Sequence, residues 1–171
     1  MRLADHLVVM DAGRVAAIGP VTEIMGRSDL HPLLGRYEAG AILNARVLAQ
    51  DDAYGLTVLG FAGGELRVPT LPYALGAAVR VRIRARDVIV AREHPEALGA
   101  SNILAGVIRR LRVEAGTFAE LELDLGGSLL LVRMTRLSVD RLGHSEGQAV
   151  WAVIKSVAIE RRSVALGAEG E

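Results

Sequence analysis

The sequence contains no cysteine among its 171 residues, which excludes disulfide bonds, thiolate catalysis and zinc or iron–sulfur sites built on cysteine. Aromatic residues make up only 4% while apolar residues make up 51%, so the core must consist of valine, leucine, isoleucine and alanine. No apolar run approaches the roughly 20 residues that a membrane-spanning helix needs. The first residues include an aspartate and a histidine where a secretory signal has its apolar stretch. We therefore expect a soluble, intracellular protein.

Net charge is also lacking, because 20 basic and 20 acidic residues cancel. Long polyanions and anionic membrane surfaces are bound through an excess of positive charge, so the balance argues against both as partners. The high apolar content argues against disorder. The 19 glycines lie between short apolar runs, which indicates many turns and a mainly β fold. The length suffices for one ordinary domain or two small ones.

The first 30 or so residues predict a hairpin followed by a short helix. Residues 7–10 and 15–18 are apolar runs typical of strands, and the turn between them contains Gly13, which tolerates a positive φ. Residues 22–25 predict a helix with its apolar positions on one face. Such a unit is too small to fold alone, so it looks like the end of a larger one. A polar connector punctuated by proline and glycine follows, with the linker at residues 31–40.

The rest of the chain predicts short strands separated by turns, in the pattern of a barrel or a sandwich. The expected strands span residues 41–49, 56–61, 65–68, 78–90, 102–113, 118–125, 128–134 and 149–159. The series contains an internal repeat. Residues 41–47 are echoed by 102–107, residues 63–66 by 126–129, and residues 76–84 by 147–155. We therefore expect two similar β units, at residues 41–95 and 99–167, with an insertion at 135–143 in the second only.

Few residues suggest an enzyme active site in this chain. The histidines are His6, His31, His94 and His144, and none has metal-ligand spacing with another, so we expect exposed or turn positions. Phosphate loops, nucleophile elbows and zinc-protease motifs are all missing from the sequence. The carboxylates of Glu120, Glu122 and Asp124 alternate, which predicts a solvated strand face rather than a catalytic pair. We expect no catalytic residues.

Four arginines, at positions 80, 82, 84 and 86, alternate with apolar residues and are predicted to share one strand face. The favoured interpretation is the polar outer face of a half-buried strand. The alternative is a nucleic-acid surface on an OB-like barrel. Interleaved aromatic residues for base stacking are missing and the net charge is zero, so we expect no nucleic-acid partner.

The second unit holds the residues most suggestive of binding. Thr135 and Ser138 lie three apart in a predicted helical turn, and Lys155 sits on an otherwise apolar strand, where burial of an ammonium requires an anion. Hydroxyls and an ammonium are donors that a tetrahedral oxyanion needs. The alternative is a helix cap at Thr135 or Ser138 and a lysine whose head group reaches solvent. Spacing alone leaves both interpretations open.

The N-terminal residues resemble a known family. Arg2-Leu3-Ala4-Asp5-His6-Leu7-Val8-Val9-Met10-Asp11-Ala12-Gly13-Arg14-Val15, continuing to Pro20 and the helix up to Asp29, is similar to the end of an ABC transporter nucleotide-binding domain. The resemblance implies that residues 1–30 are the C-terminal remnant of that domain. It also implies that the ATP-binding and hydrolysing motifs precede Met1, so we expect this chain neither to bind nor to hydrolyse ATP.

The second repeat resembles the molybdate-binding Mop/TOBE module. Its opening, middle and last motifs are similar to Ser101-Asn102-Ile103-Leu104, Thr135-Arg136-Leu137-Ser138 and Ile154-Lys155-Ser156-Val157, across residues 99–160. The resemblance implies an OB-like five-stranded barrel in each repeat, a homodimer, and an oxyanion, molybdate or tungstate, held at barrel or subunit interfaces.

Carried over to this sequence, the implied oxyanion ligands are Thr135, Ser138 and Lys155, with Ser101 and Asn102 from the opening motif. That motif commonly reads Ser-x-Arg-Asn, whereas this chain has Gly99-Ala100-Ser101-Asn102 and so lacks the cation. Backbone N–H groups around Ser101 remain as donors.

Together the two resemblances imply the C-terminal region of the ATPase subunit of a molybdate ABC importer. Its expected function is to sense intracellular molybdate and regulate uptake. The expected location is cytoplasmic, with the parent protein peripheral at the cytoplasmic face of the inner membrane. The membrane permease subunits would be contacted through the ATPase domain. The alternatives are a purely structural dimerisation module of such a subunit and an OB-type nucleic-acid-binding protein.

Overall fold

The N-terminal unit is a hairpin that packs on a short helix, as the sequence predicts. The computed structural model describes residues 6–30, 33, 40–113 and 116–166. Strands β1 (His6–Asp11) and β2 (Arg14–Pro20) pair antiparallel, and Ala12 and Gly13 have φ values of 46° and 78° in the turn. One hairpin face covers α1 (Val21–Gly26) and the 3₁₀ turn η1 (Ser28–Leu30). The predicted linker, residues 31–40, lies almost wholly outside the described residues.

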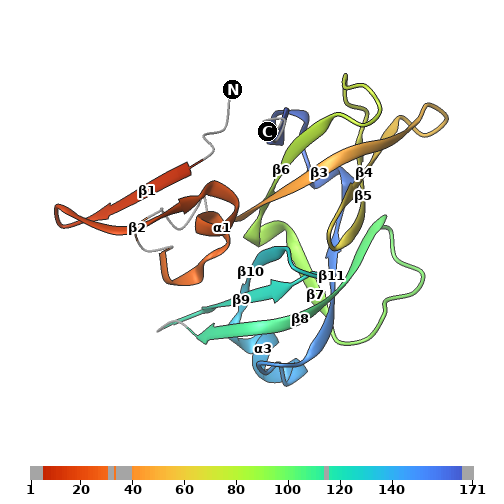
Figure 1. Cartoon of the computed structure of the whole chain (residues 1–171). Coiled ribbons are helices and arrows are strands. Elements are labelled where there is room, and N and C mark those ends of the chain that lie inside the picture. The colour runs from red at the N-terminus through yellow and green to blue at the C-terminus, as the bar shows by residue number, and fades with distance from the viewer. Residues whose placement is uncertain (1–5, 31–32, 34–39, 114–115, 167–171) are drawn as a thin grey trace.

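The remaining strands form two antiparallel sheets of five strands each (Figure 1). The first has the order β12-β6-β3-β4-β5, and the second has the order β10-β9-β8-β11-β7. Their strands are β3 (Gly40–Asp51), β4 (Leu56–Phe61), β5 (Gly64–Pro69), β6 (Ala78–Arg84), β7 (Val88–Ala91), β8 (Asn102–Val113), β9 (Phe118–Asp124), β10 (Leu129–Thr135), β11 (Ala149–Ile154) and β12 (Val164–Leu166). The fold is mainly β, as expected from the sequence.

Each sheet takes its fifth strand from the other repeat. After β6, the turn η2 (Ala85–Asp87) carries the chain into the second sheet, where β7 pairs with β11. After β11, the turns η3 (Ser156–Ala158) and η4 (Arg161–Ser163) carry it back, and β12 pairs with β6. The single strands expected at residues 78–90 and 149–159 are therefore wrong. Both runs break because the chain changes sheets, and β12 was not expected.

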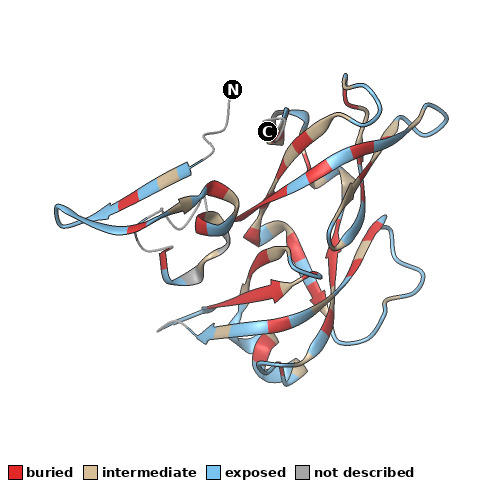
Figure 2. Ribbon diagram, in the orientation of Figure 1, coloured by how far each residue is buried: buried red, intermediate tan, exposed pale blue. Residues whose placement is uncertain are grey.

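One aliphatic core connects the two sheets. The same cluster of buried residues contains Leu43 and Ile83 from the first sheet and Ile108, Leu121 and Ile154 from the second. The largest fully buried side chains among the described residues are all isoleucine or leucine, as the low aromatic content predicts. Figure 2 shows buried segments in red on strands of both sheets. A contiguous core of this kind makes the two sheets one packing unit.

The N-terminal unit rests on both sheets. Helix α1 contacts β3 and β10, and η1 contacts β9. Within the unit, the Arg27 guanidinium donates to both carboxylate oxygens of Asp29, at 3.0 and 2.6 Å. This hydrogen bond holds the pKa of the Asp29 carboxyl below its ordinary value.

The carboxylate face of β9 is not solvated, contrary to the sequence-based prediction. Glu120 is 1% exposed and Glu122 is 7% exposed. In the sheet register Glu122 lies opposite Arg110, and Glu120 lies between Arg112 on β8 and Arg133 on β10. The alternation of carboxylates along β9 correctly predicted a polar face, but it does not show that η1 contacts this strand.

The arginine-rich strand agrees with the prediction except at its end. Arg80, Arg82 and Arg84 are half-buried on one face of β6, while Val81 and Ile83 between them are buried. Arg86 lies in η2 rather than on the strand, because the chain has already left the first sheet.

Candidate functional site

Thr135 and Ser138 lie together where β10 passes into the helix α3 (Arg136–Leu142). The Thr135 side chain caps this helix, because its Oγ1 accepts a hydrogen bond from the Ser138 N–H at 3.2 Å. The two hydroxyl oxygens are 2.8 Å apart. The helix-cap interpretation of the sequence is therefore confirmed for Thr135.

The helix cap leaves one hydroxyl proton of the Thr135–Ser138 pair without a use. Each hydroxyl carries one proton, and the mutual hydrogen bond uses one of the two. Thr135 is exposed and Ser138 is half-buried, so the other proton is available at the surface. The pair can therefore cap the helix and still donate to an anion.

Asn102 begins β8 and is committed to a contact between the two sheets. Its Oδ1 accepts from the Arg67 backbone N–H at 2.6 Å, and its Nδ2 donates to the Arg67 carbonyl at 3.0 Å and to Ser156 Oγ at 3.4 Å. The side chain is 1% exposed. The side-chain amide of Asn102 thus pairs with the Arg67 backbone of β5 as the backbone of a neighbouring strand would. Sequence reasoning missed this role, since its only signal is a polar residue at an inward position of a strand.

Lys155 directly follows β11 and is the only lysine in the chain. Ile154 pairs with Asn102, so continuing the register by one residue places Lys155 opposite Ser101. Both residues are exposed. The premise that Lys155 needs an anion in order to be buried is therefore wrong, because the chain turns into η3 at this point and leaves the ammonium in solvent.

The predicted site residues form two separate groups. Thr135 lies opposite Phe118, beyond the Val113 end of β8, whereas Ser101 and Lys155 lie at its Asn102 end. Strand β8 has 12 residues, which corresponds to roughly 35–40 Å at the usual rise per residue. Along the sheet, one copy of the chain therefore does not bring the two groups together.

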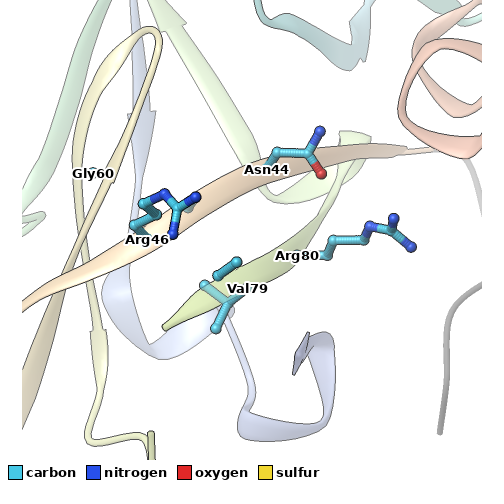
Figure 3. A pocket seen from close by; sticks show the side chains of 7 residues that line it. Asn44, Arg46, Gly60, Val79 and Arg80 are labelled. Carbon is cyan, nitrogen blue, oxygen red and sulfur yellow. The ribbon is translucent and has the colours of Figure 1, made fainter. Parts of the chain in front are cut away.

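A surface groove of about 400 Å³ lies elsewhere, on the outer face of the first sheet. Its lining includes Asn44, Arg46, Gly60 and Arg80, and none of the predicted site residues. Figure 3 shows Asn44 and Arg80 extending in the same direction, while the Arg46 guanidinium lies apart from that of Arg80. Arg46 Nη1 donates to the Gly76 carbonyl at 3.1 Å. The guanidinium groups of Arg46 and Arg80 therefore do not converge on one point in the groove.

The histidines do not form a metal site in the part of the chain that the structure describes. His6 and His94 are exposed, and His31 lies outside the described residues. His144 is buried in the turn after α3, with Nδ1 3.0 Å from Gln148 Oε1. Within residues 6–30, 33, 40–113 and 116–166, no three His, Asp or Glu side chains gather as metal ligands do. No helix in these ranges has the length and apolar character to cross a membrane.

Comparison with known families matches the second repeat, from the loop before β8 to the turn after η3. The matching family is the TOBE domain, over residues 99–160. All five predicted site residues lie within the segment that matches this family, as the resemblance in sequence implied.

Relatives extend the similarity to nearly the whole chain. The molybdenum import ATP-binding protein ModC of Mesorhizobium japonicum is 45% identical over 166 residues, which are 97% of this chain and 45% of the relative. ModC of Paramagnetospirillum magneticum is 39% identical over 96% of this chain and 46% of the relative. The chain thus spans less than half the length of these relatives. Nearly the whole chain is therefore similar to part of ModC, as the motifs suggested.

The fold has a counterpart among solved structures. A molybdate-bound form of the cytoplasmic molybdate-binding protein ModG superposes with a TM-score of 0.65 at 24% identity, covering 74% of this chain and 95% of ModG. This likeness supports the OB-like fold of the region around the TOBE domain.

Proposed function

We propose that this chain is the oxyanion-binding regulatory region of the ATP-binding subunit of a molybdate importer. Molybdate or tungstate is the ligand, and its binding senses the intracellular level and regulates uptake through the relative affinities of two states of the subunit. The observation that carries the proposal is the exposed Thr135–Ser138 hydroxyl pair within a TOBE domain whose relatives are molybdenum import proteins.

The donor chemistry supports this ligand. A tetrahedral oxyanion only accepts hydrogen bonds, and the two groups offer hydroxyls from Thr135, Ser138 and Ser101 and the ammonium of Lys155. Asn102 positions the second group by fixing the start of β8. Because the groups lie at opposite ends of that strand, the proposal has the anion bound between two copies of the chain, in a homodimer.

The same proposal gives the chain its place in a larger protein. Residues 1–30 are the end of an ATP-binding domain, 31–40 are the linker, and 41–95 and 99–167 are the two repeats. The outer face of the hairpin supports this division, because Val8, Met10, Val15 and Ile18 are 50–69% exposed there (Figure 2). The ATP-binding domain would contact the permease subunits at the cytoplasmic face of the membrane, and we expect no nucleic-acid partner.

The single lysine makes a direct test possible. Calorimetric titration with molybdate, tungstate and sulfate is expected to show binding of the first two, and the side-chain NMR signal of labelled Lys155 should shift with the same affinity. Replacing both Thr135 and Ser138 by alanine, or Lys155→Ala, should each weaken binding at least about tenfold, the effect of about 1.4 kcal/mol. Arg14→Ala removes one exposed cation from the hairpin turn and should leave binding unchanged.

The variants also separate the alternative functions. Thr135→Ala removes the helix cap, so its unfolding free energy must be compared with its affinity. An absence of heat and of any Lys155 shift at millimolar molybdate would leave the purely structural dimerisation module. Salt-dependent binding of single-stranded nucleic acid with no response to molybdate would instead favour the OB-type nucleic-acid function.

A further inference from the structure

An arginine lies on the same face of the second sheet as Thr135. Side chains two residues apart on a strand point to the same side of the sheet, so Arg133 and Thr135 of β10 share a face. Phe118 of β9 pairs directly with Thr135 in the register, and the side chains of paired residues lie side by side on one face. Arg133, Phe118 and Thr135 are therefore neighbours at this end of the sheet.

The Phe118 ring shows in which direction the Arg133 side chain extends. The guanidinium carbon lies 4.5 Å from the centre of the ring, within the distance of a cation–π contact. The residue directly opposite Arg133 is Glu120, and Phe118 lies two positions away on β9, opposite Thr135. The Arg133 side chain therefore extends along the sheet toward Thr135 and holds its positive charge beside the Thr135–Ser138 pair.

The charges on the paired residues next to Phe118 leave a positive excess. Glu120 is 1% exposed, and it lies opposite Arg133 on one side and Arg112 on the other. One carboxylate thus lies between two guanidinium groups. A guanidinium has five N–H donors, so a contact with Glu120 leaves Arg133 with donors for an anion. Arg133 is half-buried and Phe118 is 43% exposed, so this end of the sheet is open to an anion from solvent.

A second arginine, Arg136, follows Thr135 directly in the sequence, but its charge is offset. Its Nε lies 3.6 Å from Asp140 Oδ2, one turn further along α3. The two side chains are 60% and 64% exposed, so solvent screens their charges. Arg136 thus extends along the helix, whereas Arg133 is held over Phe118. Of these two arginines, Arg133 is the one placed to meet an anion that the hydroxyl pair binds.

We propose that Arg133 donates to the oxyanion beside Thr135 and Ser138 and makes the site selective for a doubly charged anion. The inference rests on the proposed function and adds to it a binding residue and a basis of selectivity. Hydroxyls donate to any tetrahedral oxyanion, because they carry no net charge. A guanidinium favours the anion of larger charge, because Coulomb attraction grows with the product of the charges. With Lys155 in the other group, two cations meet the two negative charges of molybdate or tungstate.

The test compares molybdate with perrhenate, a tetrahedral oxyanion that carries a single negative charge. In calorimetric titrations the wild type is expected to bind molybdate more tightly. Arg133→Gln should weaken molybdate binding at least about tenfold and perrhenate binding less, so the ratio of the two affinities should fall. Arg133→Lys retains the charge and should restore most of that ratio. Loss of structure alone would weaken both anions alike.

Three further variants separate a contact from a general effect of charge. Arg136→Gln is the matched control, because it removes an exposed cation next to Thr135, and it should leave the ratio unchanged. Arg112→Gln removes the arginine on the far side of Glu120 and should lower the ratio less than Arg133→Gln does. Phe118→Leu keeps every charge but removes the ring that positions Arg133, so it should lower the ratio even if Arg133→Gln does not fold. Circular dichroism verifies folding.

The outcomes distinguish this inference from the proposed function. A wild type that binds neither anion would overturn both. Molybdate binding that Arg133→Gln and Phe118→Leu leave unchanged would overturn this inference and retain the proposed function. Equal losses in Arg112→Gln and Arg133→Gln would assign the effect to the overall charge of the sheet face, and parallel losses of molybdate and perrhenate would assign it to structure. Either result would also overturn the role of Arg133.

Discussion

The equivalent strands β6 and β11 of the two repeats have similar residues on their inward faces and different residues on their outward faces. Strands β6 and β11 both have buried inward residues, and Ile83 and Ile154 occupy equivalent positions at 2% and 1% exposure. Outward, Arg80 of β6 stands where β11 has Trp151. The inward positions are constrained alike because both strands cover one shared core. The outward positions are free to diverge, and there the repeats acquire different surfaces.

The same contrast continues at the ends of the strands. Asn102 begins β8 with a polar side chain, while Ala41 occupies the equivalent place in β3. Only the second repeat has the insertion that forms α3 and carries the Thr135–Ser138 pair. The second repeat therefore has polar groups at the ends of its strands that the first repeat lacks. This difference supports the proposal that the second repeat binds the oxyanion.

The largest expected effect tests whether the inward positions are equivalent. Ile83→Ala and Ile154→Ala should each lower the free energy of unfolding by about 2–5 kcal/mol, the range for truncating a buried aliphatic side chain. Because the core is shared, each variant should still unfold in one transition. Urea denaturation followed by Trp151 fluorescence and by circular dichroism measures this. Two separated transitions, or a marked loss in only one variant, would contradict the equivalence.

A smaller effect tests the difference at the strand starts. Asn102→Ala leaves the Arg67 N–H and carbonyl without their side-chain partner and should cost about 1–3 kcal/mol. Hydrogen exchange at the Arg67 amide should accelerate in this variant. Ser156→Ala removes only the 3.4 Å contact and should have a smaller effect on both measurements. Equal effects of the two variants would mean that the contact with β5 contributes little.

The smallest effect concerns the attachment of the N-terminal unit, which contacts β9 of the second sheet through η1. The lowered pKa of the Asp29 carboxyl means that its pair with Arg27 adds stability above the ordinary carboxyl pKa and loses it as pH falls through the lowered value. Side-chain exposures of 38% and 43% limit the contribution to about 0.2–1 kcal/mol. Asp29→Asn should therefore be slightly less stable than the wild type at neutral pH.

The pH dependence provides the control for this last prediction. The difference in unfolding free energy between wild type and Asp29→Asn should vanish in acid and shrink at high salt. Adding Arg27→Gln to Asp29→Asn should cost little more, because the pair is already broken. A difference that persists in acid would assign the effect to packing.

Turn residues and apolar spacing predicted most strands and helices well, but they did not predict which strands pair with each other. The hairpin, the helix at residues 22–25 and the repeat follow from turn residues and apolar spacing, and the structure contains them. The exchange of strands was not predicted, because residues 88–91 are all apolar and give no alternation from which a change of phase could be seen. The structure shows that change: buried positions are odd-numbered at Val79 and Val81 but even-numbered at Val88 and Val90.

The sequence allowed us to predict which residue types belong to the candidate site, but it did not allow us to predict how those residues are arranged in space. Thr135 and Ser138 meet because they are three apart in one helical turn. Lys155 and Ser101 each stand next to a member of the paired residues Ile154 and Asn102, and a single sequence does not reveal that pairing. The burial of Glu120 and Glu122 was not predicted either, because alternation along β9 does not show which other elements contact the strand.

The exchanged strands β7 and β12 bear on how this protein could have arisen. A single ancestral repeat, made as a separate polypeptide, would have four strands of its own sheet and a fifth that fits a neighbour. Two such polypeptides would complete each other's sheets, as β7 and β12 do within this chain. One repeat transferred alone would leave its own sheet one strand short and carry a strand that has no sheet to join.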